Sequence, residues 1–179
     1  MDVWQEHAWY MHDPKDYPPA YREAIKEVSI RGRVALGTVC LEALCKSLGV
    51  DDVRVRASIA QFRDYTSATR LDLWSEEMWH LIEWAIKIVE ENTGSPDSAV
   101  YQGLPMSVLR TLYDVYDVAT INLYGGTGEW SPGTLAPALA ILDRLRVAKL
   151  TWPDLGTFIR SSFGEAGGWG LPEDSSRFG

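Results

Sequence analysis

The most regular pattern of apolar and polar positions in the chain runs from Ser75 to Asn92. On a helix at about 100° per residue, the polar side chains of this stretch fall in one stripe and nearly all other positions are apolar. The stripe consists of Glu76, His80, Glu83, Lys87, Glu90 and Glu91. A helix that is apolar over most of its circumference needs other helices around it. We therefore expect a Trp-rich central helix with Ser75 as its N-cap and one narrow face open to water or to a partner.

Apolar positions repeat with the same period in five further stretches that are joined by short loops. These stretches are residues 20–28, 33–48, 52–65, 106–123 and 132–149. Gly49 is placed to end the second stretch, Asp51 to cap the third, and Ser131 with the following proline to start the last. Residues 29–32 are interpreted as a break, and no stretch has the alternation that predicts a strand. The sequence predicts an all-α fold, a single-domain bundle of about six helices.

The two ends of the chain differ from this helical domain, which we place at residues 19–155. Residues 1–18 are aromatic and interrupted by proline, with Trp4, Trp9 and Tyr10 among them. We expect an N-terminal arm that packs on the domain through its aromatic side chains. Residues 156–179 are rich in glycine and serine, and we expect a loosely ordered tail that scattered aromatic residues pin to the domain.

Length and composition suit one domain with a full-sized core, because the 179 residues are 46% hydrophobic. No apolar run is long enough for a transmembrane helix, and the first residues lack the basic start and apolar run of a signal peptide. The expected location is the cytoplasm. Cys40 and Cys45 are five residues apart and fall on different sides of one helix, which predicts two buried thiols rather than a disulfide or a zinc pair.

The net charge of −8, from 25 acidic against 17 basic residues, disfavours nucleic acid as a partner and favours a basic protein. Nucleic-acid binding needs a basic patch, so a direct nucleic-acid partner is disfavoured. Acidic charge suits a basic protein partner, because opposite potentials speed the encounter. Some of the eight tryptophans are candidates for interface anchors.

The polar stripe contains the candidate residues for catalysis or metal binding, because Glu76 and Glu83 flank His80 at helical spacing. Glu77 with His80 copies half of the ligand set of helical di-metal proteins, but the chain has no second copy of this motif. We favour a solvated or partner-facing polar seam and keep a small helical enzyme or metal-binding protein as the alternative. His7 and His12 match no established metal-ligand spacing.

A second candidate surface begins at residues 113–117, where two aspartates alternate with two tyrosines. Tyr124 and Trp130 follow, and acids interleaved with aromatic residues are typical of a surface that binds a basic protein. The alternative is a salt-bridged outer face with tyrosines half in the core. The predicted partner-binding residues are Glu76, His80, Glu83, Tyr113, Asp114, Asp117, Tyr124 and Trp130. No catalytic residue, metal ligand or cofactor is assigned.

Several segments together resemble certain all-helical immunity proteins of bacterial toxin systems. They are Val34–Leu36, Cys40–Leu44, Asp51–Arg56 and Trp74–Trp84. In that family a helix with a small-Cys-hydrophobic pattern precedes a second helix that contains Asp-Asp-x-Arg. The likeness covers about residues 33–90. It implies a cytoplasmic, acidic protein that binds and neutralises a toxin and has no catalysis of its own.

The favoured function is a non-enzymatic protein-binding module, most concretely an immunity-type inhibitor that masks a basic surface of a bacterial toxin. The alternative is the enzyme or metal protein that would use His80, Glu76 and Glu83. A third option is a structural subunit that assembles through its Trp-rich arm and tail. Nothing in the sequence fixes the oligomeric state.

Overall fold

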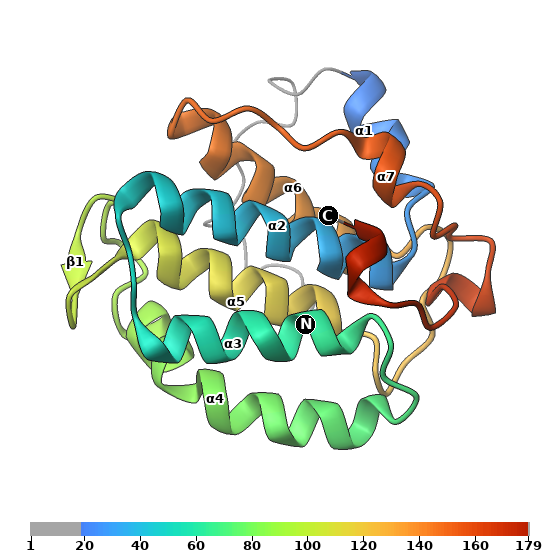
Figure 1. The fold of residues 1–179 in the computed structure, drawn as a ribbon, viewed down its shortest axis with the longest axis horizontal. Coiled ribbons are helices and arrows are strands. Elements are labelled where there is room, and N and C mark those ends of the chain that lie inside the picture. The colour runs from blue at the N-terminus through green and yellow to red at the C-terminus, as the bar shows by residue number, and fades with distance from the viewer. Residues whose placement is uncertain (1–18, 179) are drawn as a thin grey trace, which may run out of the picture.

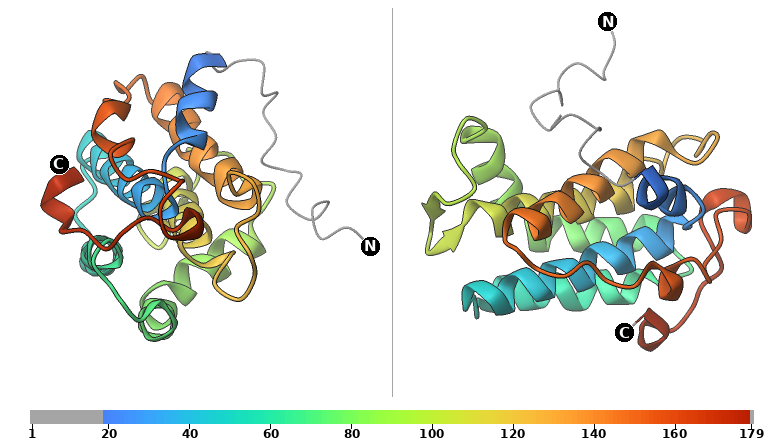
Figure 2. Two further views of the ribbon diagram at one scale, coloured as in Figure 1. Left: turned by 90° about the vertical axis from the view of Figure 1, so that its right-hand side faces the viewer. Right: turned by 90° about the horizontal axis from the view of Figure 1, so that it is seen from above.

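The computed structural model describes residues 19–178, which form one helical bundle with a small hairpin (Figures 1 and 2). Its seven α-helices are α1 (Pro19–Lys26), α2 (Ile30–Leu48), α3 (Val53–Tyr65), α4 (Leu71–Glu91), α5 (Met106–Thr120), α6 (Pro132–Val147) and α7 (Leu155–Phe158). Two short 3-10 turns follow, η4 (Ala166–Gly168) and η5 (Ser175–Phe178). The all-α prediction is confirmed. The predicted N-terminal arm lies outside the described residues.

Helices α2 and α5 have the most neighbours in the bundle. Helix α5 packs on α2, α3, α4 and α6, and α2 packs on α3, α5 and α6. In Figure 1 the long helices α6, α2, α5, α3 and α4 lie one below another, with α1 and α7 across one end. Helix α4 packs chiefly on α3 and α5, so its remaining side faces outwards.

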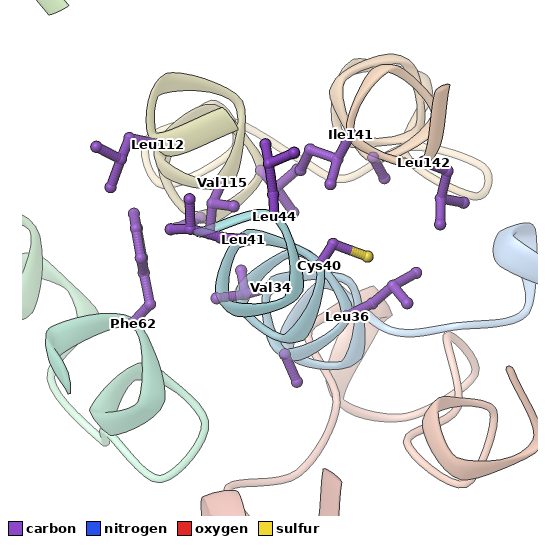
Figure 3. Close-up of a cluster of buried hydrophobic side chains, with 14 of the residues drawn as sticks. Val34, Leu36, Cys40, Leu41, Leu44, Phe62, Leu112, Val115, Ile141 and Leu142 are labelled. Atoms are coloured by element: carbon purple, nitrogen blue, oxygen red, sulfur yellow. The ribbon is translucent and has the colours of Figure 1, made fainter. Parts of the chain in front are cut away.

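Gly37 allows α2 to approach α5 and α6 closely at the centre of the core. A Cβ atom at this position would lie 2.9 Å from Val115 Cγ2 and 3.1 Å from Ile141 Cδ1. Figure 3 shows both side chains turned toward α2, and Phe62 of α3 reaching toward Leu112 of α5. Because protein interiors are close-packed, a larger residue at position 37 would force these helices apart.

Two helices, α2 and α3, begin at residues other than the predicted ones, and the capping side chains explain the difference. Ser29, predicted inside a break, is the N-cap of α2, and its hydroxyl accepts a hydrogen bond from the Gly32 N–H at 3.0 Å. Asp52, rather than Asp51, caps α3 by accepting the Arg54 N–H at 2.8 Å. In both cases the side chain that reaches the first free N–H groups decides where the helix begins.

Helix α4 begins at Leu71, one turn before the predicted start at Ser75, and Arg70 at its N-cap makes no side-chain cap hydrogen bond. Packing accounts for the extra turn. Trp74 is buried in it, with its ring centroid 4.7 Å from that of Tyr65 and its indole N–H donating to the Gln61 carbonyl at 2.8 Å. Tertiary contacts with α3 thus replace a local cap.

The hairpin, like the short helical turns after residue 154, is an element that the sequence did not predict. Strands β1 (Val100–Tyr101) and β2 (Leu104–Pro105) pair antiparallel between α4 and α5. Gln102 and Gly103 turn between them with φ of 50° and 83°. Strands of two residues are too short for an alternating pattern to register in the sequence.

Residues 156–178 pack against the start of α2. The Ser29 N–H donates to the Ser161 carbonyl at 2.8 Å and the Arg31 N–H donates to the Trp169 carbonyl at 3.1 Å. Phe158 and Phe178 are buried, and their rings stack with centroids 6.1 Å apart. Aromatic packing and backbone hydrogen bonds together hold this segment against the start of α2.

Arg33 is a fully buried cation held mainly by carbonyl groups. Its guanidinium donates to the carbonyls of Ile25 and Lys26 at the end of α1, at 3.3 and 3.2 Å. It also donates to the carbonyls of Trp130 and Ser131, at 2.9 and 3.0 Å. Burial lowers its pKa to about 10, so the group remains charged at neutral pH. Arg33 therefore ties the end of α1 to the start of α6.

Replacing Arg33 with methionine removes all of these donors, while a long apolar side chain still occupies the space. We expect the free energy of unfolding to fall by at least about 3 kcal/mol, because the Lys26 and Trp130 carbonyls lose their side-chain donor, and a buried carbonyl left without a donor costs about 1–3 kcal/mol. Urea unfolding followed by circular dichroism measures the loss. Arg56→Met is the control, since Arg56 is 59% exposed where it pairs with Asp51, and such pairs contribute less than about 1 kcal/mol. Equal losses in the two variants would contradict the role given to Arg33.

Candidate functional site

The predicted polar stripe is found on the outer side of α4. Glu76, His80 and Glu83 are all exposed, and Lys87 and Glu90 continue the row. The exposed side is wider than the stripe, because Leu73 is 46% exposed and Trp79 is 44% exposed. Helix α4 therefore presents acidic and apolar side chains together.

Trp79 is the functional candidate that the sequence reasoning missed. Its ring centroid lies 6.3 Å from that of Tyr116 on α5. The helical period contained a signal for this exposure. At about 100° per residue, Trp79 falls only about 20° from Glu90 and about 40° from Glu83.

On α5, Tyr113 and Asp117 lie half-buried beside this row. Burial, with help from the nearby negative charges of Asp114 and Glu90, raises the pKa of Asp117 to about 7. Burial and the charge of Asp117 likewise raise the pKa of the Tyr113 hydroxyl. The side chains form an electronegative surface in which an added positive charge would be favourable. We call Glu76, Trp79, His80, Glu83, Tyr113, Tyr116 and Asp117 the acidic–aromatic face.

Asp114 does not lie on this surface, contrary to the prediction. It is 1% exposed, and its carboxylate pairs with the Arg144 guanidinium of α6. Asp97, before β1, accepts a hydrogen bond from Arg110 at 2.5 Å and lies 3.9 Å from Arg144 Nε. Two arginines and two aspartates thus join α5, α6 and the α4–β1 connection. A partner that approaches the acidic–aromatic face cannot contact Asp114 directly.

The two predicted aromatic residues beyond α5 are placed differently. Tyr124 is 88% exposed and lies four residues beyond the end of α5. Trp130 is half-buried against α1, with Lys26 Nζ 4.7 Å from its ring centroid. Tyr124 therefore stands in solvent beyond α5, and Trp130 belongs to the packing of α1 on α6.

Within residues 19–178, no group of three or more His, Cys, Asp or Glu side chains could hold a metal ion. Cys40 and Cys45 are buried free thiols, as predicted, and burial raises their pKa values to about 12 and about 11. Among the described helices, none combines the length and apolarity that a membrane crossing requires. His7 and His12 lie outside the described residues.

Comparison of the chain with protein-family models, with curated proteins and with solved structures found no match. The acidic–aromatic face is therefore interpreted from its own geometry and charge.

The raised pKa of Asp117 predicts how stability changes with pH. The folded protein holds a proton on this carboxyl up to about pH 7, against an ordinary value of 3.8. The raised pKa of Asp117 therefore contributes its full stabilisation below about pH 4, where the carboxyl is protonated in both the folded and the unfolded state. This stabilisation decreases as the pH rises and is lost once the pH passes 7. Asp117→Asn removes this pH dependence. The difference in the free energy of unfolding between variant and wild type should therefore shift in favour of the variant by more than about 1 kcal/mol from pH 5 to pH 8, because one pKa unit corresponds to about 1.4 kcal/mol.

Urea unfolding of both proteins at pH 5 and pH 8 measures this difference, and comparison across pH cancels any constant effect of the substitution. Asp64→Asn, at an exposed position of α3, is the matched control and should change stability equally at both pH values. A pH-independent effect of Asp117→Asn would disprove the assignment.

Proposed function

We propose that this protein is a non-enzymatic protein-binding module whose acidic–aromatic face binds a basic surface of another protein. The observation that carries the proposal is Trp79, a large aromatic side chain that is 44% exposed beside Tyr116. Trp and Tyr are enriched among the residues that dominate binding energy at interfaces. Leaving such a side chain in water is unfavourable, and a partner that covers it recovers this free energy.

The charges around Trp79 favour a basic partner. Glu76, Glu83 and Glu90 are exposed on the same side of α4, in a chain of net charge −8. Lysine and arginine of a partner would meet these carboxylates at the rim and the faces of Trp79 and Tyr116 at the centre, where cation–π attraction adds to burial. Opposite potentials also accelerate association, in a manner that salt weakens.

More specifically, we propose an immunity-type inhibitor that acts in the bacterial cytoplasm and neutralises a cognate toxin by covering its basic surface. The support is the resemblance over residues 33–90. The residues that carry it have structural positions in this fold: Cys40 is buried in α2, and Asp52 caps α3 and pairs with Arg54 at 2.9 Å. The resemblance thus concerns the scaffold, and the acidic–aromatic face supplies the binding surface.

The first test is recovery of the partner at low ionic strength with the immobilised protein, followed by calorimetry with the purified pair. Trp79→Ala should weaken the affinity at least about 30-fold, which corresponds to the 2 kcal/mol that defines a hot spot. Val53→Ala is the control truncation, because Val53 is 67% exposed on α3, outside the face, and it should leave the affinity unchanged.

Charge reversal provides an independent test of the basic character of the partner. Glu83→Lys should slow association about tenfold and reduce its dependence on salt, because rim charges act mainly on the association rate. Glu23→Lys on α1, where the side chain is 65% exposed, makes the same charge change outside the face. If no protein binds at low salt, or if the two reversals act alike, the proposal is wrong.

A further inference from the structure

An open groove of about 750 Å³ lies between α1, the end of α6 and residues 149–155. Its lining includes Tyr21 of α1, Arg146 of α6, and Lys149, Trp152 and Asp154 of the segment that follows α6. Because the groove is wide and open to solvent, it suits a chain segment laid across it rather than an enclosed small ligand. None of these residues belongs to the acidic–aromatic face.

The floor of the groove is aromatic and fixed in place. The Tyr21 and Trp152 rings lie with centroids 4.5 Å apart. The Tyr21 hydroxyl donates to the Pro153 carbonyl at 2.7 Å, and the Trp152 indole N–H donates to the Leu142 carbonyl at 2.9 Å. Because both polar groups are bonded within the protein, the ring faces provide an apolar, preorganised surface on which another aromatic side chain can stack.

The rim of the groove is more basic than the chain as a whole. Arg146 is 46% exposed beside its partner Asp143, and Lys149 is exposed on the first turn after α6. Among the lining residues that the structure describes, the one acid is Asp154, whose carboxylate accepts the Gly156 N–H at 3.0 Å as the cap of α7. Aromatic floor and cationic rim together suit a segment that carries both aromatic and acidic side chains.

We propose that the occupant of this groove is the chain's own first eighteen residues. That segment contains Trp4, Trp9, Tyr10 and Tyr17, and its charges are four acidic side chains against one lysine. It leads directly into α1, which begins at Pro19 and lines the groove through Tyr21. Eighteen residues span at most about 60 Å when extended, so the tether easily covers the distance.

The tether also makes this occupant more favourable than a free peptide of the same sequence. A short covalent connection gives an effective concentration in the millimolar range, so even weak stacking and charge pairing suffice for occupancy. A separate acidic peptide would have to outcompete it. The groove therefore acts as an internal docking site that keeps the Trp-rich segment bound to the domain.

A photo-crosslinking experiment on the full-length protein tests the proposal. Trp9 is replaced by benzoylphenylalanine, the dilute monomer is irradiated, and the cross-linked peptides are identified by mass spectrometry. Cross-links within one chain should concentrate on residues 146–155. Cross-links spread over other elements, or joining two chains, would overturn the proposal, the latter in favour of a second copy as the occupant.

Charge reversal at the rim separates specific docking from chance proximity. Lys149→Glu in the same photoreactive protein should lower the yield of cross-links to residues 146–155 at least threefold. Lys46→Glu, at an exposed position near the end of α2, is the matched control and should leave the yield unchanged. Equal yields in the two variants would mean that charge complementarity does not hold the segment in the groove.

Discussion

The arrangement of the bundle depends on buried guanidinium groups that bind the carbonyl ends of helices. The last carbonyls of a helix have no partner within it and must find donors elsewhere. Arg33 supplies donors to the end of α1, and Arg31 does the same for α3 through the carbonyls of Tyr65 and Ala68, at 2.5 and 2.8 Å. Both arginines lie in the first turn of α2, so one helix start fixes the ends of two neighbours.

A second set of charges fixes α5 and thereby positions the acidic–aromatic face. Arg110 of α5 donates to the carbonyls of Thr93 and Ser95 just beyond α4, at 2.9 and 2.7 Å, and Arg144 holds Asp114. Breaking such a buried pair is costly, because it leaves a charge without compensation. The pair keeps one aspartate of α5 neutralised in the interior, while Asp117, one turn later, remains part of the electronegative surface.

The three tryptophans of α4 illustrate how one helix serves both the core and the surface. They are spaced five residues apart, so they point to three different sides of the helix. Trp74 is buried against α3, Trp84 lies with the Arg54 guanidinium 4.1 Å from its ring centroid, and Trp79 is exposed beside Tyr116. Hydrophobicity alone does not distinguish these positions, because the difference is which side of α4 has a neighbour.

Local patterns in the sequence determined helices α1 to α6, their approximate bounds, the buried thiols and the polar stripe of α4, because periodicity and capping act within a few residues. Contacts between distant residues decided the rest. Packing of Trp74 against α3 accounts for the extra first turn of α4, and the ion pair with Arg144 holds Asp114 in the interior. The tertiary structure also exposed Trp79 and placed Trp130 against α1. Burial of a side chain depends on which elements cover it, and those elements are far away in the chain.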